Sequence, residues 1–252
     1  MPLLTLDREG SGPPLAWLHG FTQTRSSARQ FRSILAGRHE VLTLDLPGHG
    51  SAATIDASLP EIAELVLDAL PREPLSLGGY SFGARVALHV AVADSSRLRA
   101  LVVLGASRGL ADPLERTRRR ERDESLAEHL LEVGTETFFS EWLSQPLFAT
   151  LGAHSELDTR SDDAAGLARC LRRAGTGNQE WLGGGLASLD LPTLALAGEL
   201  DTKFVLEGRA LAQSLRHGSF ASIAGAGHAA HLEKPEQVAR AIEDFLTSLT
   251  TG

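Results

Sequence analysis

Short apolar runs that end in glycine-rich turns recur along this chain and alternate with helical patterns. Largely apolar runs of this length are typical of strands buried on both faces, as in a parallel sheet. The runs are Leu15–Leu18, Val41–Leu46, Leu75–Leu77, Leu101–Leu104, Leu194–Ala197 and Phe220–Ile223. Helical patterns lie between or after them, at Ala28–Leu35, Leu59–Leu70, Ala84–Ala93 and Pro235–Leu249. This alternation predicts an α/β fold with a mostly parallel, doubly wound sheet.

The middle of the chain has a different pattern. Between residues 109 and 188 the strand-like runs stop, and charged or amphipathic helical segments such as Pro113–Val133 and Glu136–Leu143 replace them. A chain of 252 residues is long enough to bury one large core. We therefore expect an α/β core made of residues 1–108 and 189–252, with residues 109–188 inserted into it as a helical cap.

The composition argues against several classes of protein. With 24 basic and 32 acidic residues the formal net charge is −8, which argues against a general nucleic-acid binder. The one cysteine, Cys170, cannot form an internal disulfide framework or a multi-cysteine metal site. The chain has no apolar stretch of about 18 residues, and its N-terminus does not resemble a signal peptide. We expect a cytoplasmic protein that binds neither nucleic acid nor a membrane, and the sequence leaves its oligomeric state open.

The pattern G-x-S-x-G occurs at residues 79–83, with a strand pattern before it and a helical pattern after it. This motif places a serine on a tight strand-to-helix turn, where glycines avoid clashes that a Cβ atom would make. Ser81 is therefore the candidate catalytic serine. The Phe82 N–H, at the start of the helix, would face negative charge that forms beside Ser81. The Phe21 N–H, which follows the first core strand, fits the second donor of an oxyanion hole.

A catalytic serine needs a histidine to take its proton, and the histidine needs an acid to orient it. Asp201 follows one late strand pattern and His228 follows the next. The order Ser, Asp, His along the chain is that of α/β-hydrolase sheets, and the carboxyl ends of parallel strands are where such sheets place their sites. Ser81, Asp201 and His228 are thus predicted to form a catalytic triad.

Other titratable residues near these positions are rivals. Glu199 lies two residues before Asp201, and we expect it at the end of the strand rather than against the histidine. His231, three residues after His228, is interpreted as a structural or rim residue. His19 and His49 lie in turns after early strands, and we expect both to pack there rather than to transfer protons.

Arginines are concentrated early in the predicted cap. On a helix, Arg116, Arg119 and Arg120 share one face with Asp123. Arg85 follows Ser81 by one helical turn and could also reach a pocket there. Guanidinium groups bind carboxylates through paired hydrogen bonds, so these side chains indicate a polyanionic substrate.

The chain resembles the α/β-hydrolase superfamily over most of its length and, within it, a narrower family. That family is the 2-succinyl-6-hydroxy-2,4-cyclohexadiene-1-carboxylate synthases, which are lyases of the menaquinone pathway. The resemblance rests on GYSFGAR at 79–85, RxxRxxxD at 116–123, WLSQPLF at 142–148, GTGNQ at 175–179, GELDTKF at 198–204 and GAGHAAHLE at 225–233. Phe82 and Ala84 depart from the family, which often has Met and Gly there.

The resemblance implies elimination of pyruvate from a cyclohexene carboxylate that carries succinyl and enolpyruvyl groups, with no metal or cofactor. Ser81, activated by His228 and Asp201, would act as a base. The residues that would line the site and hold the carboxylates of the substrate are Tyr80, Arg85, Arg119, Trp142, Arg160 and Lys203.

Two other functions remain open at this point. A carboxylesterase or acyl-CoA thioesterase would use the same triad with Ser81 as nucleophile, and a thioesterase could use arginines for the phosphates of CoA. A non-catalytic binding protein on this fold is the third possibility, although such a protein has no need for a complete Ser, Asp and His set.

Overall fold

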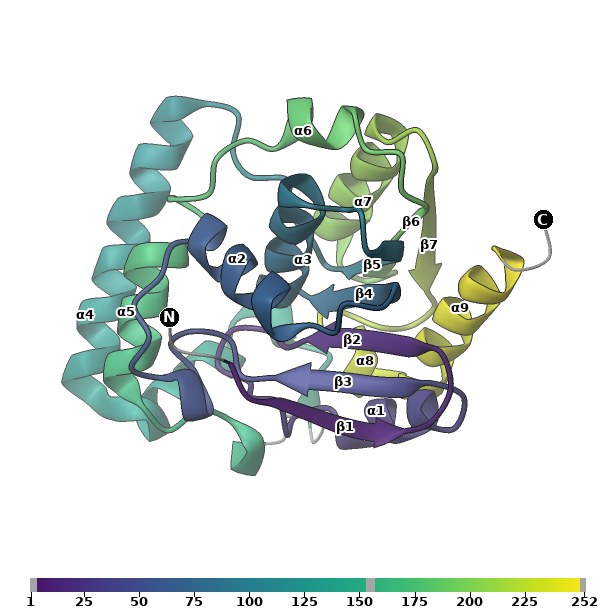
Figure 1. Cartoon of the computed structure of the whole chain (residues 1–252). Helices are drawn as coiled ribbons and strands as arrows, with labels where there is room; N and C mark the ends of the chain where they lie inside the picture. Colours follow the sequence, from purple (N-terminus) through teal and green to yellow (C-terminus); the bar gives the residue numbers. More distant parts are fainter. Residues whose placement is uncertain (1–3, 153–156, 250–252) are drawn as a thin grey trace.

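The computed structural model describes residues 4–152 and 157–249. Its centre is a seven-stranded sheet with the order β1-β3-β2-β4-β5-β6-β7 (Figure 1). The strands are β1 (Leu6–Gly10), β2 (Pro14–Leu18), β3 (Glu40–Leu44), β4 (Leu75–Tyr80), β5 (Leu98–Leu104), β6 (Thr193–Gly198) and β7 (Gly218–Ile223). β1 pairs with β3 antiparallel, whereas the other neighbouring strands in this sheet run parallel. The predicted α/β fold and its six predicted strands are confirmed.

β1 is the strand that the apolar pattern did not predict. It reads Leu-Asp-Arg-Glu-Gly and leaves most of its side chains partly or fully exposed. It lies at the edge of the sheet, where it pairs with β3. An edge strand of this kind buries little apolar surface, so it lacks the signal that identifies the central strands.

Successive residues of the central strands point into two cores, one on each face of the sheet. In β2, Ala16 and Leu18 belong to the first core, whereas Leu15 and Trp17 belong to the second. This alternation explains why the strand is apolar throughout. The helices over the first core are α2 (Leu59–Ala69), α3 (Phe82–Ala93) and α7 (Thr202–Ser214), and those over the second are α1 (Arg29–Ala36), α8 (Ala230–Glu233) and α9 (Pro235–Ser248) (Figure 1).

The described part of the segment between β5 and β6 is helical and contains no strand. Its elements are α4 (Pro113–Leu143), η2 (Pro146–Phe148), η4 (Leu157–Thr159), α5 (Ala164–Ala174) and α6 (Gly183–Ala187). The two helices predicted within α4 meet at Gly134, whose φ of 76° and ψ of 172° interrupt the helix. α6 packs against α3 and α7 of the core, and the predicted cap boundaries at 109 and 188 stay a prediction.

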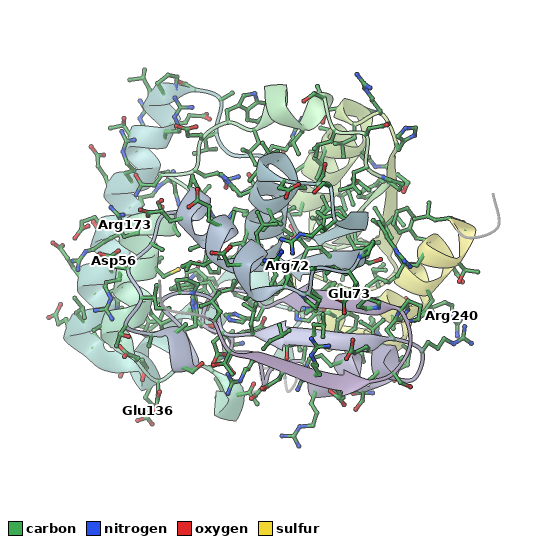
Figure 2. The ribbon with its side chains drawn as sticks, in the orientation of Figure 1. Asp56, Arg72, Glu73, Glu136, Arg173 and Arg240 are labelled. Atoms are coloured by element: carbon green, nitrogen blue, oxygen red, sulfur yellow. The ribbon has the colours of Figure 1, made fainter. Side chains whose placement is uncertain are left out.

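α4 and α5 pack together at one end of the sheet (Figure 1). Their contact is apolar and includes Leu130, Phe138, Leu167 and Leu171. Arg173 at the end of α5 pairs with Asp56, which lies just before α2 of the core, with 3.0 Å between Nε and Oδ1 (Figure 2). None of the helices in the described ranges is long and apolar enough to cross a membrane.

Candidate active site

Ser81 occupies the turn between β4 and α3, in a conformation that serine seldom adopts. Its φ is 51° and its ψ is −104°, and strain of this kind costs about 1–3 kcal/mol. The neighbouring glycines make the turn possible. A Cβ atom on Gly79 would lie 2.6 Å from the Gly83 carbonyl carbon, and one on Gly83 would lie 2.2 Å from the Leu18 oxygen. The G-x-S-x-G motif therefore holds the Ser81 hydroxyl at the carboxyl end of the sheet.

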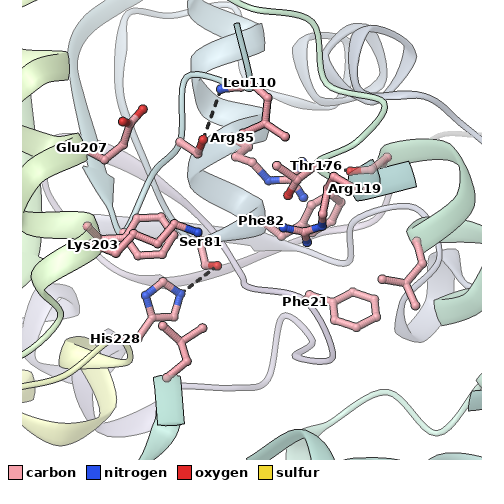
Figure 3. Close-up of a pocket in the computed structure, with 18 of the residues that line it drawn as sticks. Phe21, Ser81, Phe82, Arg85, Leu110, Arg119, Thr176, Lys203, Glu207 and His228 are labelled. Atoms are coloured by element: carbon pink, nitrogen blue, oxygen red, sulfur yellow. Dashed lines mark hydrogen bonds between the residues drawn. The ribbon is translucent and has the colours of Figure 1, made fainter. Parts of the chain in front are cut away.

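The three predicted triad residues meet at this turn. The Nδ1 of His228 is 2.7 Å from Oδ2 of Asp201, and its Nε2 is 3.1 Å from Oγ of Ser81 (Figure 3). When the His228 Nδ1–H donates to Asp201, Nε2 is left to accept from the Ser81 hydroxyl. His228 and Asp201 are 2% and 8% exposed, so water competes little for either contact. This geometry allows His228 to take a proton from Ser81.

The His228 ring is confined on several sides. The Phe204 and Tyr80 ring centroids lie 4.6 Å and 5.3 Å from its own. A Cβ atom on Gly105, whose φ is +63°, would lie 2.9 Å from Cε1 of His228. Gly105 and Phe204 were not among the predicted site residues, although Gly105 directly follows a predicted strand.

The rival residues have other partners. The Glu199 carboxylate accepts a hydrogen bond from the Gly225 N–H at 3.0 Å and so holds the loop after β7. The His231 ring lies 4.2 Å from the Tyr80 ring. Burial, together with His228 nearby, lowers the pKa of His231 to about 3, so the ring is neutral at physiological pH. Both residues have the structural roles that we expected.

Two buried histidines shape the loop that carries Phe21. Nε2 of His19 accepts from the Leu46 N–H at 3.0 Å, and Nε2 of His49 accepts from the Thr22 N–H at 3.3 Å. Burial lowers the pKa of both rings, that of His49 to about 3. A neutral imidazole can accept at Nε2 only while Nδ1 carries the proton, so both rings are fixed as structural groups.

The Phe21 N–H is left unpaired between two bonded neighbours. The Gly20 N–H donates to the side chain of Gln23 at 2.8 Å, and the Thr22 N–H donates to His49. Neither the Phe21 N–H nor the Phe82 N–H has an acceptor within residues 4–152 and 157–249. Phe82 is the first residue of α3, where the helix leaves its N–H groups without internal partners. Both groups are therefore available to bind an anion, and their role as an oxyanion hole stays a prediction.

A cavity of about 500 Å³ opens beside Ser81 and His228. Three cationic side chains line it, Arg85, Arg119 and Lys203, and Figure 3 shows the two arginines on one side of Ser81 and the lysine on the other. Burial lowers the pKa of Arg85 to about 10 and also lowers the pKa of Lys203. With a pKa of about 10, Arg85 still carries its charge near neutral pH, so the cavity favours an anionic ligand.

One acidic side chain, Glu207, also lines this cavity, but it is paired. Its Oε1 accepts from Nε of Arg108 at 3.1 Å. Lys203 makes no ion pair with Asp201 within the part of the chain that the structure describes. Glu207 was missed by the sequence analysis, although it follows Lys203 by one turn of α7.

The three arginines predicted on one face of α4 do not share one role. Arg119 reaches the cavity, whereas Arg116 donates to the Leu110 carbonyl at 2.9 Å and Arg120 donates to the Thr117 hydroxyl at 3.0 Å. The expectation of a shared site role was therefore wrong for two of these three arginines. Helical periodicity places residues on one side of a helix, but it does not say how far along that side the cavity extends.

Tyr80 and Arg160 line a second, smaller cavity of about 20 Å³. Ser81 and Trp142 line both cavities, so the second adjoins the first at the candidate serine. Arg160 donates to the hydroxyl of Thr22. Burial raises the pKa of Tyr80, which keeps its hydroxyl protonated. The six residues predicted to bind substrate are thus divided between the two cavities.

No group of three or more His, Cys, Asp or Glu side chains in the described ranges is arranged to hold a metal ion. Cys170 is buried and lines the larger cavity, and burial raises the pKa of its thiol to about 12.

Comparisons with known proteins agree on the family. The model of the alpha/beta hydrolase family matches residues 15–241. The 2-succinyl-6-hydroxy-2,4-cyclohexadiene-1-carboxylate synthase of Klebsiella pneumoniae is 34% identical over 244 residues, which cover 94% of each chain. The synthase of the same name from Serratia proteamaculans is 32% identical over 252 residues, which cover 95% of each. The solved structure of MenH from S. aureus has a TM-score of 0.90 and 28% identity, and the match covers 99% of this chain and 100% of that one. The chain therefore belongs to the alpha/beta hydrolase family and, within it, to the 2-succinyl-6-hydroxy-2,4-cyclohexadiene-1-carboxylate synthases.

Proposed function

We propose that this protein eliminates pyruvate from 2-succinyl-5-enolpyruvyl-6-hydroxy-3-cyclohexene-1-carboxylate, to give 2-succinyl-6-hydroxy-2,4-cyclohexadiene-1-carboxylate in menaquinone biosynthesis. The observation that carries the proposal is the convergence, in one cavity, of the Ser81–His228 pair with three cationic side chains. A plain esterase of apolar acyl chains has no use for such cations. The names of the relatives support the same reaction.

Ser81 acts as the base in this proposal. His228, oriented by Asp201, takes the proton of the Ser81 hydroxyl while Oγ removes the ring proton next to the succinyl ketone. The C–H electron pair forms a carbon–carbon double bond, and negative charge moves onto the ketone oxygen. The N–H groups of Phe21 and Phe82 are free to donate to that oxygen, and each donor of this kind contributes about 10²–10³-fold to rate in acyl-transfer enzymes.

The enolate then collapses and expels the leaving group. Its electrons move through the ring alkene, and the bond between the ring carbon and the enolpyruvyl oxygen breaks. The leaving group departs as the enolate of pyruvate and takes up a proton to give pyruvate. No acyl-enzyme forms, and the proton that Ser81 and His228 have taken returns to solvent or to the departing enolate.

Different cationic side chains bind different carboxylates of the substrate. The substrate has three, on the ring, the succinyl group and the enolpyruvyl group. Arg85, Arg119 and Lys203 line the larger cavity, and Arg160 lies by the smaller one. In the proposed complex Tyr80 and Trp142 supply apolar walls beside the serine, where both already line a cavity.

The test is release of pyruvate from the enolpyruvyl substrate, which the preceding enzyme of the pathway makes in situ. Lactate dehydrogenase then couples pyruvate to NADH oxidation. We expect rapid release by the wild-type protein and little hydrolysis of simple esters or acyl-CoA thioesters. If folded protein releases no pyruvate but hydrolyses esters or thioesters, Ser81 is a nucleophile and the proposal is wrong. Binding of a carboxylated ligand without turnover of any substrate would contradict both enzymatic functions.

A further inference from the structure

The carboxylate of Asp123 in α4 is bonded to two elements at once. Oδ1 accepts from Nε of Arg119 at 2.7 Å, and Oδ2 accepts from the Gly177 N–H at 3.0 Å. Asp123 is 2% exposed, so both contacts are protected from water. Gly177 belongs to the loop of residues 175–179 that follows α5, which we call the bracket loop. Asp123 thus ties Arg119 to the bracket loop.

Gln179, at the other end of the bracket loop, makes the corresponding contact with Arg85. Its Oε1 accepts from Nη1 of Arg85 at 3.3 Å, and its amide nitrogen donates to the Ser107 carbonyl at 2.9 Å. Nη1 of Arg85 also donates to the Ala174 carbonyl at 3.0 Å. Gln179 is fully buried, and both ends of its amide are paired. One loop therefore holds both arginines of the cavity.

These contacts leave some of the N–H groups of each guanidinium without an acceptor among the described residues. Arg119 is bonded through Nε, and its Nη1 and Nη2, an edge that can pair with a carboxylate, have no acceptor in residues 4–152 and 157–249. Arg85 is bonded through Nη1, and its Nε and Nη2 have no acceptor in residues 4–152 and 157–249. The two like charges are also close enough for Arg119 to help lower the pKa of Arg85. An anion placed against both would relieve that repulsion.

The bracket loop packs closely against α4. A Cβ atom on Gly175 would lie 2.5 Å from Oδ2 of Asp123, and one on Gly177 would lie 2.3 Å from the Arg120 backbone nitrogen. Glycines at these positions let the loop approach α4 closely enough for the Gly177 N–H to reach Asp123. A long arginine side chain loses conformational entropy when it binds a ligand, and a side chain that is already held loses less.

We propose that Asp123 and Gln179 are positioning residues that fix Arg119 and Arg85 in the geometry that binds two carboxylates of the substrate. The identity of that substrate rests on the proposed function, whereas the positioning itself rests on the contacts above. Carboxylates are present before and during the elimination, so their binding stabilises the ground state and the transition state alike. Loss of positioning therefore raises KM and leaves kcat nearly unchanged.

The experiment compares Asp123→Asn and Gln179→Met with the matched control Glu124→Gln. Glu124 is the next residue of α4, and its exposed carboxylate pairs with Arg172 of α5 at 2.7 Å, away from the cavity. Glu124→Gln removes the same charge from the same helix and also breaks a contact between α4 and α5. Thermal unfolding checks that each variant is folded. Asp123→Asn tests the positioning of Arg119, and Gln179→Met tests that of Arg85. The proposal can therefore be tested even if only one of these two variants folds.

We expect KM for pyruvate release to rise about tenfold or more in Asp123→Asn and in Gln179→Met, with kcat within about twofold of wild type. Glu124→Gln should keep the wild-type KM. A charge effect alone would instead lower KM in Asp123→Asn, because the cavity becomes more positive. An unchanged or lowered KM, a loss confined to kcat, or an equal rise in the control would overturn the proposal.

A second readout separates failure of this inference from failure of the proposed function. If the wild-type protein releases no pyruvate, calorimetric titration with benzene-1,3,5-tricarboxylate replaces the kinetic assay. The inference then predicts that wild type and Glu124→Gln bind this probe and that Asp123→Asn and Gln179→Met bind it about tenfold more weakly or not at all. Equal binding by all four proteins, or no binding by wild type, would overturn the inference.

Discussion

Because Gly105 has no side chain, the His228 ring can lie close to its backbone. Replacement of Gly105 by alanine therefore tests whether proton transfer depends on the position of this ring. An added Cβ atom would lie 2.9 Å from Cε1 of His228, and the ring would have to retreat by roughly half an ångström to restore an ordinary contact. Phe204 and Tyr80 confine that movement. Displacements of about 1 Å cost about 10²-fold in rate, so we expect kcat of Gly105→Ala to fall about tenfold to a hundredfold.

Gly225→Ala is the matched control. Gly225 has a φ of +64°, against +63° for Gly105, and a Cβ atom there would contact nothing within 4 Å. A left-handed backbone costs alanine about 1–2 kcal/mol, so both variants should lose at least this much stability. For a chain of this size that loss lowers Tm by about 2–8 °C.

The assay is pyruvate release at saturating substrate, together with thermal unfolding of both variants. We expect Tm to fall in both variants, and further in Gly105→Ala because of the added overpacking, whereas kcat should fall in Gly105→Ala alone. A kcat of Gly105→Ala within about twofold of that of Gly225→Ala would refute this expectation, since the ring would then tolerate the added methyl group without leaving its working position.

Three further predictions concern buried titratable groups. Asp201→Asn should lower kcat by about 10⁴-fold, because His228 then takes the wrong tautomer. Its control, Glu199→Gln, should retain wild-type turnover. Equal losses of kcat in the same pyruvate assay would contradict the assignment of Asp201 as the acid. Burial lowers the pKa of His231 from 6.5 to about 3, so between these pH values the ring is protonated in the unfolded chain but not in the folded one. The free energy of unfolding should therefore fall as pH drops from 7 to 5, by roughly 1–2 kcal/mol for this side chain. Urea unfolding of His231→Gln should show a shallower pH dependence, and an unchanged slope would contradict the burial argument. The raised pKa of Cys170, about 12, predicts that iodoacetamide at pH 8 labels it slowly in the native protein and rapidly in urea, as mass spectrometry would show; rapid native labelling would contradict this.

The parts of the fold that sequence reasoning predicted are those with a strong local signal. β2 and β5 are apolar on both faces because each face meets a core, so periodicity identifies them. The break in α4 at Gly134 was also visible as two helical segments. β1 was missed because it is polar and lies at an edge, where tertiary pairing with β3 rather than burial makes it a strand.

The same distinction holds in the site. Ser81, Asp201 and His228 follow three strand ends, and a parallel sheet brings such ends together, so chain order and topology predicted their meeting. The division between Arg119, which lines the cavity, and Arg116, which binds a carbonyl, depends on where α4 passes the cavity. That position is set by packing between α4 and α5, which no short pattern encodes.

The claim that Ser81 is the base is tested most directly by the rate at which Ser81→Ala releases pyruvate under saturating substrate. The variant keeps His228, Asp201 and the cationic side chains, so substrate should still bind. The account predicts that kcat falls by about 10²–10⁴-fold while KM changes little. Turnover within a few-fold of wild type would contradict it, because another group would then be removing the ring proton.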